Sequence, residues 1–303
     1  MLDALTIIDD FQPIIDLVIK GLTNDNTRRG YKQSITHFLN WWVSEGRPTF
    51  CKDLVLRYRL ALSRGNLSIS TINMRIIVLH KLAMESIDAG LMSAEVANGI
   101  IRIKGLRNAG NKCGNWLSIE QAERLINAPD INSPIGIRDR AILCVMLGAG
   151  LRRDECANLT LEHFQQREGR WCIIDLLGKG SRLRTIPIAE WVHSAVDAWC
   201  LTGKIYSGPI FYPLDRVWGR KPRKPITGQA VFIIVRYYAR QCGIKVTPHD
   251  LRRSFAKLAY RGKSDLIQIQ SSLGHGDPKT TLRYLGNVQS FEDAPADHLG
   301  LNL

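Results

Sequence analysis

Several features that mark common protein classes are missing from this 303-residue sequence. It has no Cys-x-x-Cys pair, no Cys and His residues at zinc-binding spacing, and no acidic cluster suited to a divalent metal. It also lacks the glycine-rich, lysine-containing loop that binds nucleotide phosphates. The sequence therefore offers no motif for a metal site or for a nucleotide site.

Long hydrophobic runs and a secretory pattern are missing as well. No apolar stretch approaches the length of a membrane span. The start, MLDALTIIDDFQPIIDLVIKGL, contains four aspartates and no basic leader, so it resembles an amphipathic helix and not a signal peptide. The seven cysteines are odd in number and scattered, which indicates reduced thiols. These features predict a cytoplasmic protein without membrane attachment.

The sequence has fewer acidic than basic residues. The chain has 41 Lys and Arg against 28 Asp and Glu, a net charge of +13 and a pI of about 9.6. Of these, 15 cations and 10 acids precede residue 116, and 26 cations and 18 acids follow it, so both halves are basic. This balance favours a polyanionic partner, with nucleic acid the leading candidate, although mildly basic proteins without such a partner also exist.

The first hundred residues have a helical pattern throughout. Apolar side chains recur at helical spacing between residues 26 and 46, at Tyr31, Ile35, Phe38, Leu39 and Trp42. Segments around 51–64, 68–89 and 93–103 repeat the pattern between short breakers. We predict a helical bundle over residues 1–103, followed by a basic linker over 104–116 that is rich in Gly and Asn.

The second domain, predicted over 117–290, mixes helices with a little β-structure. Ser118 and Gln121 form a capping-box pattern at the start of a helix. The β-rich runs 171–177 and 182–188 flank Gly-Lys-Gly-Ser and predict a hairpin with Lys179 at its tip. The fold class expected is mainly α with a small β-sheet in the second domain, and residues 291–303 form a tail.

Two basic segments are candidates for contacts with nucleic acid. One is the linker and the other is RVWGRKPRKP at 216–225, which holds five cations and two prolines. Ordinary solvated surface explains both segments almost as well. The candidate contact residues are Lys104, Arg107, Lys112, Arg216, Arg220, Lys221, Arg223 and Lys224.

Residues able to do chemistry lie at helix ends. Thr247, Pro248 and Asp250 predict a helix start that presents His249 and Arg252 side by side on its rim. Taken alone, such a pair is explained more simply as surface charge.

Three further motifs also place reactive side chains near the ends of predicted helices. Gly274 ends the next helix and fixes His275 at its exit, and Tyr284 falls in the last turn of the short helix after Pro278. Arg152 and Glu155, three apart after an apolar segment, form either an ion pair or part of an anion site. Each motif alone also has an ordinary packing explanation.

Together these motifs resemble the tyrosine recombinase, or phage integrase, family. Its pattern runs from GLRxxE through a hairpin lysine, HxLR and LGH to a tyrosine after Thr-Thr, and the sequence has every element in order: GLRRDE, Lys179, HDLRRSF, LGHGDPKTT and TTLRY. Motifs cover about residues 117–290, and the first domain is similar to the family's SAM-like core-binding domain in position and type. Arg253 and Gly276 depart from the residues frequent at their positions, and we expect neither to carry chemistry.

The resemblance implies a role for each matched residue. Tyr284 would attack a DNA phosphate to form a 3′-phosphotyrosyl link, with Arg152, Arg252 and His275 stabilising the transition state. The remaining roles are general base for His249, general acid for Lys179 and support of neighbouring groups for Glu155.

The resemblance also implies partners and a class of reaction, and it implies that the reaction needs neither a metal nor another cofactor. A site-specific recombinase of this kind works through a Holliday junction, as a tetramer on double-stranded DNA sites, with or without a second recombinase, in the nucleoid. The absence of a motif for a further N-terminal domain favours a simple Xer-type or transposon-associated recombinase. Two alternatives remain: a type IB topoisomerase, which the LGH segment and short chain disfavour, and an inactive DNA-binding factor, which the intact residue set disfavours.

Overall fold

The computed structural model describes residues 6–107, 115–178, 183–214 and 224–285. The chain divides into two compact units, residues 1–111 and 112–303, and each is described here by itself. Several positions singled out from the sequence lie outside the described residues, namely Lys112, Lys179, Arg216, Arg220, Lys221, Arg223 and the tail 291–303.

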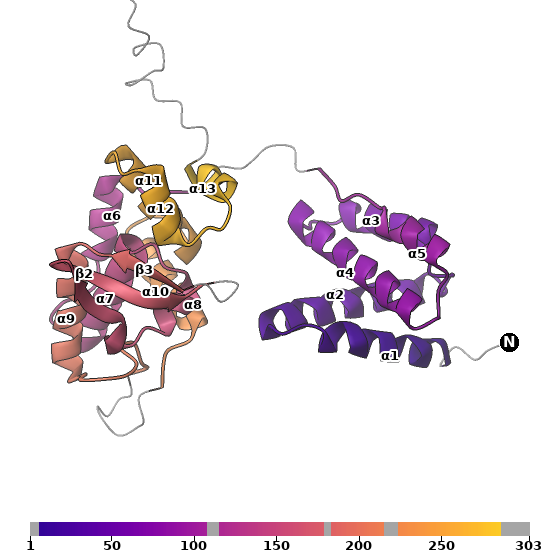
Figure 1. The fold of residues 1–303 in the computed structure, drawn as a ribbon, viewed down its shortest axis with the longest axis horizontal. Helices are drawn as coiled ribbons and strands as arrows, with labels where there is room; N and C mark the ends of the chain where they lie inside the picture. Colours follow the sequence, from indigo (N-terminus) through magenta and orange to yellow (C-terminus); the bar gives the residue numbers. More distant parts are fainter. Residues whose placement is uncertain (1–5, 108–114, 179–182, 215–223, 286–303) are drawn as a thin grey trace, which may run out of the picture. The chain divides into compact units, whose positions relative to one another are not determined.

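The described part of the first unit is wholly helical, as the sequence predicts (Figure 1). Its helix α4 contacts each of the other four and so forms the centre of the bundle. Side-chain oxygens of Asn24, Ser68 and Ser93 cap three helix starts by accepting backbone N–H groups. The elements are α1 (Thr6–Lys20), α2 (Asp25–Ser44), α3 (Lys52–Arg64), α4 (Ile69–Asp88) and α5 (Ala94–Ile101).

The second unit combines helices with one small antiparallel sheet, which confirms the expected fold class. The Ser118 capping box forms as predicted. Its helices are α6 (Ile119–Ile126), α7 (Pro134–Gly148), α8 (Arg153–Ala157), α9 (Glu190–Gly203), α10 (Gly228–Gln241), α11 (Pro248–Arg261), α12 (Leu266–Leu273) and α13 (Pro278–Leu285), with a 3-10 turn η1 (Leu161–His163).

The sheet has three strands in the order β1–β2–β3, with β1 (Phe164–Arg167), β2 (Arg170–Leu177) and β3 (Leu183–Pro187). The predicted antiparallel pair 171–177 and 182–188 corresponds to β2 and β3. Strand β1 was not predicted from the sequence. It joins β2 through Glu168 and Gly169, both at positive φ (50° and 74°), the geometry of a tight hairpin turn.

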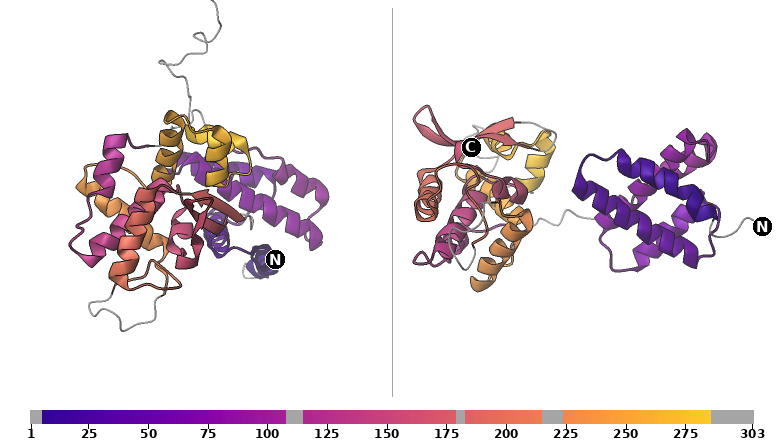
Figure 2. Two further views of the ribbon diagram at one scale, coloured as in Figure 1. Left: turned by 60° about the vertical axis from the view of Figure 1, so that its left-hand side comes forward. Right: turned by 90° about the horizontal axis from the view of Figure 1, so that it is seen from below.

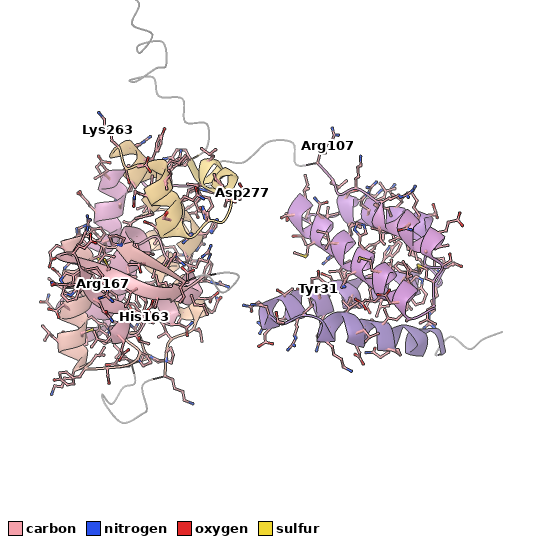
Figure 3. The ribbon with its side chains drawn as sticks, viewed as in Figure 1. Tyr31, Arg107, His163, Arg167, Lys263 and Asp277 are labelled. Carbon is pink, nitrogen blue, oxygen red and sulfur yellow. The ribbon has the colours of Figure 1, made fainter. Side chains whose placement is uncertain are left out.

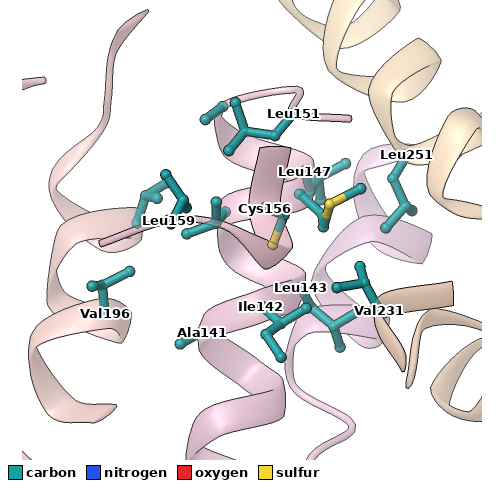
Figure 4. Packing of buried hydrophobic residues seen from close by; sticks show 14 of the residues in the cluster. Ala141, Ile142, Leu143, Leu147, Leu151, Cys156, Leu159, Val196, Val231 and Leu251 are labelled. Atoms are coloured by element: carbon teal, nitrogen blue, oxygen red, sulfur yellow. The ribbon is translucent and has the colours of Figure 1, made fainter. Parts of the chain in front are cut away.

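Helix α7 is the centre of the second unit's core. Residues 141–147 are all buried, and the helix contacts α6, α8, α9, α10 and α11 (Figure 4). A helix enclosed on all sides reads as a continuous apolar run, which is why its sequence is AILCVML. After α7 the chain turns at Gly150, whose φ is +59° and whose hydrogen faces the Phe255 ring. The core thereby holds the segment that begins at Arg152.

Helices α11, α12 and α13 pack together at one end of this unit and carry the remaining motifs (Figures 1 and 2). A small apolar cluster of Ala256, Ile269, Leu273 and Leu285 joins them. The N-cap of α12 is Asp265, whose carboxylate accepts from Ile267 N and Gln268 N. Figure 3 labels Asp277 beside the start of α13. None of the described helices is long and apolar enough to span a membrane.

Candidate functional site

The second unit brings together five of the six predicted catalytic residues around Tyr284 in α13. The Tyr284 hydroxyl lies 3.2 Å from His249 Nε2, and the Tyr284 ring centroid lies 4.8 Å from that of His275. Arg152 and Arg252 both lie near enough to act electrostatically on His275. The sixth residue, Lys179, lies outside the described residues. Segments separated by more than a hundred positions in the sequence therefore meet at one site.

Arg252 is the most deeply buried cation of this group, with 1% of its surface exposed. Its Nη1 donates to Gly150 O at 2.6 Å, and its Nη2 donates to Leu273 O. Its buried Nε has no partner in the described structure. Burial, and then the nearby charge of Arg152, lowers the pKa of Arg252 to about 10, so it stays charged at neutral pH. The sequence placed Arg252 on the helix rim, and that placement was wrong.

Arg152 is the N-cap residue of α8 and is held by Glu155. Glu155 accepts from the Arg152 backbone N–H at 2.9 Å and from its Nη1 at 2.7 Å. Burial alone would raise the pKa of Glu155, but hydrogen bonds from Arg184 and Arg152 lower it to about 2. Glu155 is thus a permanent anion that orients the Arg152 guanidinium.

Arg184 in β3 also belongs to this site, and sequence analysis did not identify it. Its Nη2 donates to Glu155 Oε2 at 2.7 Å, and its Nε donates to Ser272 O at 3.0 Å. Its side chain is 8% exposed. The available signal was the segment RLRTIP, in which an inward-facing arginine of a strand needs a buried anionic partner.

The two histidines are kept neutral by their surroundings. Burial, and then the charges of Arg252 and Arg152, lowers the pKa of His275 to about 4, while its Nδ1 lies 2.9 Å from Thr281 Oγ1. Although His249 as a whole is exposed, the protein partly desolvates its ring, and with the charges of Arg253 and Arg252 this lowers its pKa. A neutral imidazole at His249 Nε2 is able to accept the phenolic proton when that nitrogen carries no hydrogen.

Arg253 lies over the ring of Tyr284. Its guanidinium carbon is 5.6 Å from the centre of the Tyr284 ring, a cation–π distance, and its Nη1 is 3.7 Å from Asp250 Oδ1. The predicted cap of α11 is present, since the Asp250 carboxylate accepts from Thr247 N and Oγ1. Arg253 therefore helps to orient the tyrosine ring, a contact that the sequence pattern did not predict.

A pocket of about 380 Å³ opens beside these groups. Arg152, Arg252 and His249 line one part of it, and the largest apolar side chains on its wall belong to Leu151, Phe232 and Pro248. Forked guanidinium groups are suited to phosphate, and apolar walls suit the carbon surfaces of a nucleotide. No cluster of His, Cys, Asp and Glu able to hold a metal occurs in the part of the chain that the structure describes.

Three of the eight candidate nucleic-acid contact residues lie within the described ranges. Lys104, Arg107 and Lys224 are exposed, and Figure 3 labels Arg107 near the end of the first unit's described part. The other five, Lys112, Arg216, Arg220, Lys221 and Arg223, lie outside the described residues.

The depressed pKa of His275 predicts a pH-dependent stability. The pKa of His275 is 6.5 in the unfolded chain and about 4 in the folded protein, so the unfolded chain binds the extra proton first as the pH falls. The free energy of unfolding should therefore decrease between pH 6.5 and 4, by at most about 3 kcal/mol from this group. Urea unfolding of wild type and His275→Gln at pH 7.5, 6 and 5 tests this. The difference between them should change with pH, and a constant difference would contradict it.

Comparison with known proteins assigns the family. Residues 115–290, more than half of the chain, match the model of the phage integrase family. The tyrosine recombinase XerD of Pseudomonas putida is 30% identical over 294 residues, which cover 90% of this chain and 92% of that protein. The chain therefore belongs to the phage integrase family and is a tyrosine-type site-specific recombinase.

Other relatives agree with this assignment. The tyrosine recombinase XerC of Xylella fastidiosa strain 9a5c is 28% identical over 284 residues, covering 92% of this chain and 91% of that protein. Neither the topoisomerase nor the inactive-factor alternative is supported by these similarities.

Solved structures show the same fold. The Tn1549 transposon integrase in complex with circular intermediate DNA has a TM-score of 0.70 at 18% identity and covers 94% of this chain and 98% of its own. The XerH recombinase in a post-cleavage complex with palindromic difH substrate has a TM-score of 0.66 at 22% identity, over 85% and 75% of the two chains. At these identities the likeness concerns the fold.

Proposed function

We propose that the protein cleaves and rejoins DNA strands with Tyr284 as its nucleophile. The observation that carries the proposal is the position of the Tyr284 hydroxyl, 3.2 Å from His249 Nε2, with the charge of Arg252 nearby and Arg152 close to Arg252 and His275. A neutral phenol is a weak nucleophile, so it needs a base and a strongly cationic surrounding when it attacks phosphorus.

The proposed step breaks one bond and forms one. The Tyr284 oxygen bonds to the phosphorus as its proton passes to His249, and the bond from phosphorus to the 5′ oxygen breaks. Lys179 donates a proton to that leaving oxygen. Arg152, Arg252 and His275 hold the nonbridging oxygens, on which negative charge grows. The phosphotyrosyl link is itself a phosphodiester, so one ester bond replaces another of similar free energy. A 5′ hydroxyl can therefore reverse the step without an added energy source.

The partner in this proposal is double-stranded DNA with two recombination sites. Exchange through a Holliday junction needs four active tyrosines, so we propose a tetramer on DNA in the nucleoid, with or without a second recombinase. Residues 1–103 are proposed as the core-binding domain, 104–116 as the linker, 117–290 as the catalytic domain and 291–303 as the tail. The exposed Lys104, Arg107 and Lys224 would contribute contacts to phosphates, which makes binding weaken as salt rises.

A trapping experiment tests the proposal. Duplexes selected for binding from a randomised library define the site, and a nick beside the cleavage position lets the short 5′-hydroxyl fragment diffuse away after cleavage. Wild-type protein should then remain on the DNA as a denaturant-resistant adduct attached to a 3′ phosphate, and sizing before denaturation should give four protomers. If the selected duplexes bind but no adduct forms at any nick position, the proposal fails.

A further inference from the structure

We infer that Arg184 is a positioning residue that sets the orientation of Arg152 through Glu155 and links it to the turn before His275. The inference rests on the proposed function, because it assigns Arg184 a role in the cleavage step. Glu155 lies in α8, Arg184 in β3, and Ser272, whose carbonyl accepts from Arg184, near the end of α12, so the link joins separate parts of the site.

The first half of the link is a carboxylate shared by two arginines. Glu155 accepts from Arg184 Nη1 at 3.2 Å and Nη2 at 2.7 Å, in addition to its two bonds from Arg152. The side chains of Arg184 and Glu155 are each 8% exposed. Burying a cation and an anion together is costly unless their hydrogen bonds are satisfied. Here the buried pair also fixes the position of Arg152, whose side chain is 35% exposed.

Because Arg184 shares the Glu155 carboxylate with Arg152, part of the Arg152 guanidinium remains available to bind a ligand. Arg184 engages both oxygens of Glu155, and Arg152 donates to that carboxylate through Nη1 alone among its side-chain nitrogens. Within the described residues, the other two nitrogens of the Arg152 guanidinium have no protein acceptor. Without Arg184, Glu155 would keep only its bonds from Arg152, to the backbone N–H through Oε2 and to Nη1 through Oε1, and the Arg152 guanidinium could turn further toward the carboxylate as a bidentate pair.

The second half of the link reaches the turn that carries His275. Arg184 Nε donates to Ser272 O at 3.0 Å, and the next carbonyl, that of Leu273, accepts from Arg252. Gly274 adopts a φ of +60°, and an added Cβ would lie 2.8 Å from Arg184 Cδ, so the turn packs directly on the arginine. Removing Arg184 would therefore loosen both the Arg152 side chain and the backbone before His275.

The experiment compares buried arginines inside and outside the site. Arg184→Met and Arg138→Met each remove a cation that pairs with a buried carboxylate, and Arg138 pairs with Asp139 at 2.7 Å in α7. Both variants are assayed for DNA binding and for the rate of adduct formation on the nicked duplex, at a temperature where both are folded. We expect Arg184→Met to slow adduct formation about 10- to 100-fold with little change in DNA affinity, and Arg138→Met to slow it less than about 3-fold.

A second substrate separates positioning from general loosening. A methylphosphonate at the cleavage position carries a methyl group instead of one charged oxygen and so needs less help from Arg152. The defect of Arg184→Met relative to wild type should be smaller on this duplex, whereas a merely structural defect would be equal on both. Combining Arg184→Met with Glu155→Gln should slow adduct formation by less than the product of the two single effects, because both substitutions act on Arg152 and only Arg184 also holds the turn before His275.

The outcomes are distinguishable. Equal rates for Arg184→Met and Arg138→Met, an equal defect on both substrates, or additive effects with Glu155→Gln would each overturn the inference while leaving the cleavage reaction standing. No adduct with wild type on either substrate would instead overturn the proposed function. If Arg184→Met does not fold, Arg184→Lys takes the same tests, since one ammonium cannot reproduce the fork between Glu155 and Ser272 and the expected directions are unchanged.

Discussion

Replacing Tyr284 by phenylalanine should abolish the covalent adduct with DNA and leave DNA binding unchanged. The substitution removes the hydroxyl that lies 3.2 Å from His249 Nε2 and keeps the ring that packs beside His275 and under Arg253. Because the proposed intermediate is a bond to that oxygen, the rate of adduct formation should fall at least about 1,000-fold. Denaturing gels of trapped complexes measure the adduct, and mobility shifts measure binding.

A matched control is available in the same unit. Tyr237 in α10 is exposed, and its ring packs edge-on against Tyr238, so Tyr237→Phe makes the same chemical change away from the site. That variant should form the adduct at close to the wild-type rate. A persistent adduct in Tyr284→Phe would mean that another residue attacks the phosphate. A loss of DNA binding in Tyr284→Phe would mean that the hydroxyl holds the substrate, and the roles of its neighbours would need revision.

Local patterns predicted much of the fold. The caps at Ser118 and Thr247, the exit at Gly274 and the β2–β3 pair depend on neighbouring residues alone, and each is present in the structure. Strand β1 was missed because FQQR has neither alternation nor length, and it exists through its pairing with β2. A cap or a turn is decided by adjacent residues, whereas an edge strand is decided by its neighbour.

The candidate site was also predicted only in part: its motif residues were identified from the sequence, and its contacts between distant segments were not. Motif order identified Arg152, His249, Arg252, His275 and Tyr284, and the structure brings these five together. Helical spacing alone put Arg252 at a rim, because it does not show that the carbonyls of Gly150 and Leu273 converge on that position. Arg184 was missed for a similar reason, since its partners Glu155 and Ser272 are 29 and 88 residues away. Buried polar contacts between distant segments are what local patterns do not show.

Replacing Arg252 by methionine should cost both stability and cleavage. The buried guanidinium donates to the carbonyls of Gly150 and Leu273, so a thioether would leave two buried acceptors unpaired and lower the free energy of unfolding by about 2 to 4 kcal/mol. Loss of a fixed donor to the phosphate should slow adduct formation about 100- to 1,000-fold. Arg252→Lys keeps the charge but lacks the fork, so it should recover part of the stability and little of the rate.

A control substitution in the same helix separates an effect on the free energy of unfolding from an effect on the rate of cleavage. Ser254 is fully buried in α11, where its hydroxyl accepts from Leu117 N at 2.8 Å and donates to Asp250 O at 2.8 Å. Ser254→Ala should lower the free energy of unfolding by about 1 to 3 kcal/mol and leave the adduct rate unchanged at a temperature where the protein is folded. An equal loss of rate in Ser254→Ala would show that cleavage follows the stability of α11. Wild-type rates in folded Arg252→Met would remove Arg252 from the chemistry, leaving it the structural role of holding the Gly150 and Leu273 turns together.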